Sequence, residues 1–313
     1  MRQTLAAEQS SRLVLGVGFA EGRDTVAAVL EAARGAQAAL GGRAAHVALV
    51  VTAGIPSRDL VAAVRSVLGP VGIAGGATSA LLADAGPIED GALVVCVANP
   101  TAATAVATGR DLPQASQSAA RLILAARPRR VRYPRGLTVA FARPAFGAPA
   151  QEFLAPWRQL MGPKMRTACA VLPLPLLYGA PSGAPLASVA CVEGPYATGL
   201  GYADGFADDG SVDPEILIRG AVDATITALK RLEGQGARLV LVIESAARHA
   251  ALGALARDEW AAMRSEVGDR APCVGWLCAQ VAAYGRGVWP VDAHGSLVIL
   301  ALGDPPRDQL GLT

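Results

Sequence analysis

The sequence predicts an α/β protein made of two related α/β halves with mixed sheets and a β-rich insert between them. Three observations lead to this fold class. Of the 313 residues, 52% are hydrophobic and only 17% are charged, so the chain can bury a large core and is not disordered. Short apolar runs typical of buried strands alternate with segments of helical periodicity. Finally, the order helix, strand, helix, strand, loop, strand occurs twice along the chain.

The first half begins with Arg12 to Gly18 (RLVLGVG), which is typical of a strand. Residues 24–40 have apolar side chains at helical spacing and end at a glycine pair, which indicates a helix. His46 to Thr52 (HVALVVT) is a continuous apolar run, as in a strand buried on both faces. The remaining elements that we expect are a helix over 57–68 and strands at 71–74 and 91–98.

The second half repeats this order. Asp213 is a helix cap followed by Pro214, and the predicted helix runs to about Glu233. Leu239 to Ile243 (LVLVI) is a buried strand that matches HVALVVT of the first half. The further elements that we expect are a helix over 252–267 and strands at 273–278 and 295–302. The two halves therefore form a duplicated unit.

The insert between the halves contains a strand at 137–141, a helix at 151–160 and the uncharged run 167–192. That run is long enough to cross a membrane, but its prolines and glycines would break a helix, so we expect strand, loop and strand instead. An arginine-rich, proline-punctuated segment over 127–135 is predicted to be a solvated connector. Domain boundaries are expected at 1–205 and 206–313.

Composition and motifs exclude several classes of function. The net charge of +2 gives no field to attract nucleic acid or a membrane surface. Five cysteines are an odd number in a long chain, which favours a reducing, cytoplasmic setting over a disulfide scaffold. Cys273 and Cys278 are too far apart for a zinc pair, so no metal is expected. Gly16, Gly18 and Gly22 only weakly match a dinucleotide fingerprint, because acidic residues stand where the phosphates would lie.

Candidate ligand-binding residues follow the predicted buried strands. Glu244, Ser245 and Arg248 come directly after LVLVI, where groups at the carboxyl end of a parallel strand line a binding crevice. Arg248 could hold a ligand carboxylate with two parallel hydrogen bonds, so we expect it to be a ligand anchor and not a core ion-pair residue. The comparable place in the first half carries bare amides and hydroxyls that suit an anion, at Gly75, Gly76, Thr78 and Ser79.

These patterns resemble the FIST family of bacterial sensory proteins, which have an N-terminal and a C-terminal FIST domain. Residues 60–98 are similar to the family's helix, "G-C-T-T-x-G" turn and apolar strand. The segment VIESAAR corresponds to "F-S-C-A-G-R", which keeps Arg248 and places Ser245 at the cysteine. CVGWLCAQ is similar to "G-F-x-x-x-G-E-I", with Gln280 near the glutamate, and AHGSLVILAL resembles "H-N-Q-T" with His294 at the asparagine. Leu81 replaces the last glycine of the turn.

The resemblance implies a FIST N-like domain over 1–205, a FIST C-like domain over 206–313, and sensing of a small ligand such as an amino acid or organic anion. A free-standing sensor would act through a signalling partner. Some relatives bind haem, for which His249 and His294 are the candidate ligands, but we expect no cofactor.

Two other functions stay open at this stage. The crevice could belong to an enzyme with Cys278 or Ser245 as nucleophile and His294 as base, provided that nucleophile and base lie within hydrogen-bond reach. A purely structural interaction protein is favoured if no pocket of about 300 Å³ exists.

Overall fold

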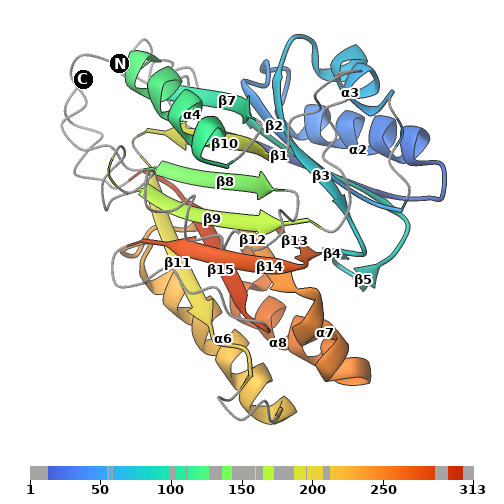
Figure 1. Ribbon diagram of the computed structural model, residues 1–313, viewed down its shortest axis with the longest axis vertical. Coiled ribbons are helices and arrows are strands. Elements are labelled where there is room, and N and C mark those ends of the chain that lie inside the picture. The colour runs from blue at the N-terminus through green and yellow to red at the C-terminus, as the bar shows by residue number, and fades with distance from the viewer. Residues whose placement is uncertain are drawn as a thin grey trace.

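The computed structural model describes the following residues: 13–54, 57, 59–98, 103–109, 112–126, 136–142, 159, 165–172, 187–194, 196–206, 212–285 and 295–305. The helix expected at 151–160, the arginine-rich segment 127–135 and His294 lie outside this described part or almost entirely so. The α/β class predicted from the sequence is confirmed, with three mixed sheets and helices on their outer sides (Figure 1).

The first and last parts of the chain form sheets with the same strand order. The first sheet has the order β1 (Val14–Glu21), β6 (Gly91–Ala98), β2 (Val47–Ala53), β3 (Gly72–Thr78). The third sheet begins with the order β11 (Ala197–Ala203), β15 (Leu297–Gly303), β12 (Ala237–Ser245), β13 (Cys273–Cys278). In both sheets the last two of these strands are parallel and the other pairs are antiparallel. The repeated order predicted from the sequence is therefore present in space.

The expected β-rich insert is a third copy of this unit. Its sheet has the order β7 (Ala103–Gly109), β10 (Ala187–Glu193), β8 (Gly136–Ala142), β9 (Met165–Val171), again with one parallel pair at the end. We refer to residues 14–98, 103–193 and 197–303 as the first, second and third units. β11 pairs only in the third unit's sheet, whereas the expected boundary at 205/206 assigns it to the N-terminal domain.

The strands exchanged between units hold the three sheets together. β4 (Leu81–Ala83) and β5 (Gly86–Ile88) belong to the first unit, but they extend the third sheet by pairing with β13. β14 (Gln280–Tyr284) belongs to the third unit and extends the second sheet by pairing with β9. Because main-chain hydrogen bonds cross from unit to unit, the units are parts of one folded body.

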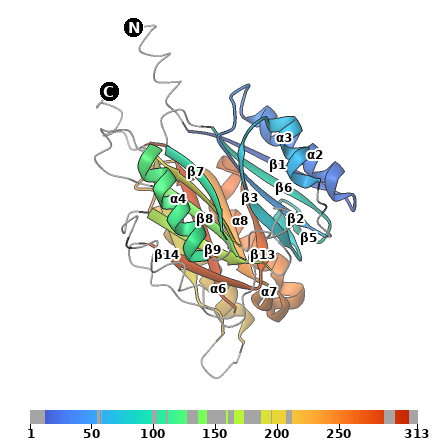
Figure 2. The same ribbon diagram turned by 45° about the horizontal axis from the view of Figure 1, so that its top comes forward.

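Helices cover the outer face of each sheet (Figure 2). The first sheet carries α2 (Thr25–Ala39) and α3 (Leu60–Leu68), and the second carries α4 (Leu112–Ala126). The third carries α6 (Pro214–Lys230) and α8 (Ala256–Val267), with the short α7 (Ala246–Leu252) before it. Asp24 and Asp213 cap α2 and α6 by accepting backbone N–H groups, and for Asp213 this confirms the predicted cap. None of the helices in the described ranges is long and apolar enough to span a bilayer.

The glycines of the weak dinucleotide motif are explained by helix packing. A Cβ on Gly16 or Gly18 would stand 2.0 or 1.8 Å from the carbonyl oxygen of Ala36 or Ala32 on α2. Gly199 and Gly201 of β11 meet Ala228 and Ala224 of α6 in the same way, at 1.9 and 1.8 Å. A side chain at these places would collide with helix backbone. The G-x-G pattern thus allows close helix–strand approach in two units.

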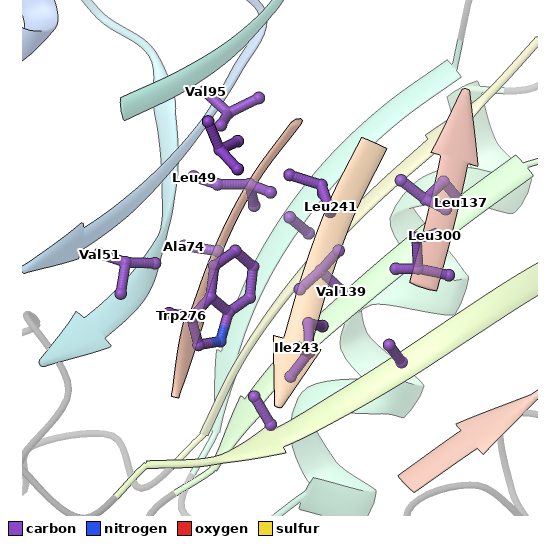
Figure 3. Packing of buried hydrophobic residues seen from close by; sticks show 14 of the residues in the cluster. Leu49, Val51, Ala74, Val95, Leu137, Val139, Leu241, Ile243, Trp276 and Leu300 are labelled. Carbon is purple, nitrogen blue, oxygen red and sulfur yellow. The ribbon is translucent and has the colours of Figure 1, made fainter. Parts of the chain in front are cut away.

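The inner faces of the three sheets meet in one central core. It contains Leu49 and Val95 of the first unit, Val139 of the second, and Leu241 of the third (Figure 3). Trp276 is fully buried in this core, and its ring lies 5.5 Å from that of Phe141 in the second unit. All five cysteines are buried, and none of them is joined to another by a disulfide.

Candidate functional site

The ends of β3 and β13 lie together, as expected if the first and third units share a site. The Thr78 hydroxyl donates a hydrogen bond to the carbonyl oxygen of Leu277, and the Leu277 N–H donates to Ala80 O at 3.0 Å. These contacts bring Thr78 next to Cys278. They also use the polar groups that the sequence offered for a ligand, because the Thr78 hydroxyl has only one proton to donate.

The glycines at this place have a structural task. A Cβ on Gly75 would stand 1.7 Å from the carbonyl oxygen of Val50 on the neighbouring strand, and its φ of 156° suits glycine. The Gly75 N–H donates to Ser188 Oγ of the second unit at 3.3 Å. Gly76 is buried beside it, and Ser79 is exposed. Within the described residues, then, the Gly75 amide is directed to protein and not to an open anion site.

Arg248 is a core ion-pair residue, and our expectation of a free ligand anchor is wrong. Its side chain is 0% exposed, and its Nε and Nη2 donate to Glu259 Oε1 at 2.8 and 2.7 Å. Nη1 donates to the carbonyl oxygens of Asp204 and Gly295 at 3.0 and 3.2 Å, and Nη2 to that of Leu217. A buried guanidinium needs an acceptor for each N–H group, and the fold supplies them from four different segments.

The partner Glu259 was missed by sequence reasoning, although its position carries a signal. It lies on the buried face of α8 with Ala256, Trp260, Met263 and Val267. A carboxylate among apolar side chains at helical spacing needs a buried cation. Burial and the neighbouring Glu244 raise the pKa of Glu259 to about 7, while Arg248 acts in the opposite direction.

Glu244 and His249 form a second charged pair beside the first. Glu244 is the last residue but one of β12 and is buried, and its Oε1 lies 3.5 Å from Nδ1 of His249. The pKa of His249 is raised, chiefly by the nearby Glu244 carboxylate and against the effect of burial. His249 lines an open pocket of about 410 Å³ together with Pro87, Glu89, Gly253, Ala254, Ala256 and Arg257.

Both candidate nucleophiles are buried and engaged. Ser245 caps α7 by accepting the Ala247 N–H and also accepts the Gly295 N–H, each at 3.3 Å. The Cys278 thiol donates to Glu244 O at 3.3 Å, and burial raises its pKa well above the usual value. The thiolate is therefore disfavoured. The candidate base His294 lies outside the described residues.

Gln280 begins β14 and is half-buried, with Val171 of β9 as its register partner. No group of three or more His, Cys, Asp or Glu side chains in the described ranges is arranged to hold a metal ion.

The larger cavity lies at the seam between the first and third units, away from the predicted residues. It is an open cleft of about 590 Å³. β1 contributes Val17, Phe19 and Glu21, and the turn from β4 to β5 contributes Asp84 and neighbours. The third unit contributes Arg264, Asp269, Arg270 and Val274. The sequence signal for this cleft is the alternation in β1: Val17 and Phe19 point to the face opposite the packed glycines.

Charges line one part of this cleft and apolar side chains another. Arg264 Nη1 pairs with Asp84 Oδ1 at 2.6 Å, which ties α8 to the β4–β5 turn. Within the described residues Arg270 makes no ion pair, so its guanidinium N–H groups are available to donate hydrogen bonds to a ligand. The cleft therefore combines a cation, carboxylates and an apolar wall, which suits a small amphipathic molecule with an acidic group.

No protein-family model and no curated protein matches the chain. Among solved structures, the chain is similar to cyanuric acid hydrolase from A. caulinodans, with 15% sequence identity over 92% of this chain and 99% of that one, at a TM-score of 0.44. It is also similar to phosphoribosylformylglycinamidine synthase II from Thermotoga maritima, with 10% identity over 94% of this chain and 72% of that one, at a TM-score of 0.30.

Proposed function

We propose that the chain is a small-molecule-binding protein whose ligand, an amino acid or small organic anion, lies in the cleft between the first and third units. The observation that carries this proposal is the cleft itself. Its volume of about 590 Å³ lies within the range of roughly 300–1,000 Å³ that is usual for ligand pockets. Its walls come from two units, as expected for a ligand held between the N-terminal and C-terminal parts.

The lining chemistry supports the ligand class. Arg270 offers paired donors for a carboxylate. Asp269 and Glu21 provide acceptors for an ammonium group, and Phe19 and Val274 provide apolar contact. From the sequence resemblance we further infer a sensory role in the cytoplasm, in which the ligated form engages a signalling partner.

The surroundings of Cys278 and Ser245 do not support the alternative in which one of them is the nucleophile of an enzyme. Both side chains are fully buried and serve as hydrogen-bonding partners of backbone groups. Ligand binding without turnover is therefore the function that we propose.

Thermal-shift and calorimetric titrations against the common amino acids and small dicarboxylates test this function. We expect at least one ligand to raise the unfolding temperature, and Arg270→Ala to weaken its binding at least tenfold, since a hydrogen bond to a charged group is worth about 1.5–3 kcal/mol. Arg121→Ala, an exposed arginine on α4 away from the cleft, is the matched control and should leave affinity unchanged. If no ligand in the panel binds, the proposal fails.

A further inference from the structure

β1 presents a free strand edge at the cleft. It is the outermost strand of the first sheet, and in the described part of the chain its ladder partner is β6 alone. Gly22 N–H donates to Asp90 O of the β6 side at 3.1 Å, which fixes the even-numbered positions as those that bond toward β6. Because these directions alternate in an antiparallel pair, the N–H and C=O groups of Val17 and Phe19 point away from β6.

The same two residues also line the cleft with their side chains. A ligand in the cleft therefore meets, on one strand, two apolar side chains and a row of main-chain donors and acceptors. This combination is what an added strand uses: main-chain hydrogen bonds give affinity and side-chain contacts give specificity.

The equivalent edge in the third unit has a main-chain acceptor that is already bonded. The glycine pairs 16/18 and 199/201 place Leu200 at the position of Val17, and the Leu200 carbonyl accepts a hydrogen bond from Arg231 Nη1 at 2.5 Å. Arg231 directly follows α6. The residue that directly follows α2 is Leu40, which packs against Gly16 and has no side-chain donor.

In the second unit, a residue of the edge strand β7 packs against the first unit. Val106 of β7 packs against Gly72 of β3, where a Cβ on the glycine would stand 2.9 Å from Val106 Cγ2. Among these three related edges, the edge of β1 is the one that lines the cleft of about 590 Å³.

We propose that the ligand of the cleft is a short peptide, a dipeptide or tripeptide with an apolar side chain, which pairs in extended form with the edge of β1 at Val17 and Phe19. Its terminal carboxylate is bound by Arg270, and its apolar side chain contacts Phe19 and Val274. This inference rests on the proposed function and narrows it from any small acidic molecule to one that carries a main-chain amide.

Calorimetry with three matched probes tests the pairing: leucine, leucyl-leucine, and leucyl-leucine methylated on its peptide nitrogen. We expect the dipeptide to bind at least tenfold more tightly than leucine. The methyl group should lower the dipeptide's affinity at least tenfold, because methylation removes its only amide donor. If leucine binds as well as the dipeptide, or methylation has no effect, the strand-pairing inference is overturned while ligand binding stands. If none of the three binds and the wider panel also fails, the proposed function falls with it.

Amide hydrogen exchange supplies a second, protein-side readout. Bound leucyl-leucine should slow exchange at Val17 and Phe19, whose N–H groups point away from β6, but not at Gly18, which already bonds toward β6. The matched variants are Phe19→Ala and Tyr202→Ala, which change the same position in the first and third units. Only Phe19→Ala should lower the affinity for the dipeptide, by tenfold or more. An equal loss of affinity in both variants would contradict binding at the β1 edge.

Discussion

The ends of β2 and β12 occupy the same place in two sheets of identical strand order, but they differ in chemistry. Val50 opposes Gly75 in the first unit and Val242 opposes Gly275 in the third, so Thr52 corresponds to Glu244 and Ala53 to Ser245. In the first unit this place is filled by small side chains. In the third unit the buried Glu244 is accompanied by Arg248, His249 and Glu259. The same backbone pattern therefore accommodates either small side chains, here called the apolar filling, or the four ionisable side chains of the third unit, here called the ionic filling. In the ionic filling every buried charge needs a partner.

The largest effect should come from breaking the ionic filling. Arg248→Met leaves Glu259 buried without its cation and removes the guanidinium hydrogen bonds to three carbonyl groups, so we expect a loss of about 3–5 kcal/mol in the free energy of unfolding. Denaturant titration measures it. Adding Glu259→Gln to Arg248→Met should recover part of the loss. A loss below about 1 kcal/mol would show that the network does not stabilise the third unit.

The ionic filling should also make stability depend on pH. Because the pKa of Glu259 is about 7 in the folded state and near 4.5 when unfolded, the folded protein binds this proton more tightly. Its contribution is fully present below about pH 4.5 and is lost as the pH rises to 7, a change of about 3 kcal/mol. The raised pKa of His249 has the same sign and acts at higher pH.

Unfolding free energies of the natural chain and Glu259→Gln, measured between pH 4.5 and 8, check this. The natural chain should lose stability relative to Glu259→Gln as the pH rises. Parallel curves for the two proteins would remove Glu259 from the titrating groups.

A sharper test of the relation between the units uses their packed glycines. Gly18→Ala and Gly201→Ala each place a Cβ 1.8 Å from a helix carbonyl oxygen, so each should cost about 1–3 kcal/mol or more through overpacking. Similar losses in both variants would show that the two strand–helix contacts are energetically equivalent. Gly35→Ala on α2, whose added Cβ makes only an ordinary contact of 3.4 Å with Gly18 Cα, is the control, and it should gain about 0.5–1 kcal/mol from helix propensity.

The smallest effect is expected at the apolar filling of the first unit. Thr52 is buried and its hydroxyl makes no hydrogen bond within the described residues. Thr52→Val removes this unpaired polar group, so we expect unchanged or higher stability, by up to about 1 kcal/mol. A loss above 1 kcal/mol, seen in the same denaturant titrations, would indicate that the Thr52 hydroxyl has a partner.

Much of the fold could be predicted because the helices and strands of the first and third units have local sequence signals. The continuous apolar runs at 46–52 and 239–243, and the aspartate caps of α2 and α6, mark strands and helices without reference to the rest of the chain. The second unit escaped detection because β7 (ATAVATG) has small residues where the other edge strands have glycines. Its pairing partner β10 begins 78 residues after β7 ends, a distance over which periodicity carries no information.

The candidate site was predicted less well, because a local sequence pattern does not show which groups a side chain such as that of Arg248 contacts. An arginine after a buried strand has the same sequence pattern whether it faces a ligand or a carboxylate from a helix 11 residues later. Only the return of α8 over α7 decided that Glu259 meets it. The cleft residues Phe19 and Arg270 stand 251 positions apart, and only the seam between two sheets brings them together.

The sequence by itself determined the α/β class, the buried strand runs and the starts of α2 and α6, since these follow from periodicity and helix capping. The tertiary structure decided the number of units, the partners of the buried charges and the place of the cleft. Those features depend on which faces of distant elements come into contact, and local free energies do not specify that choice.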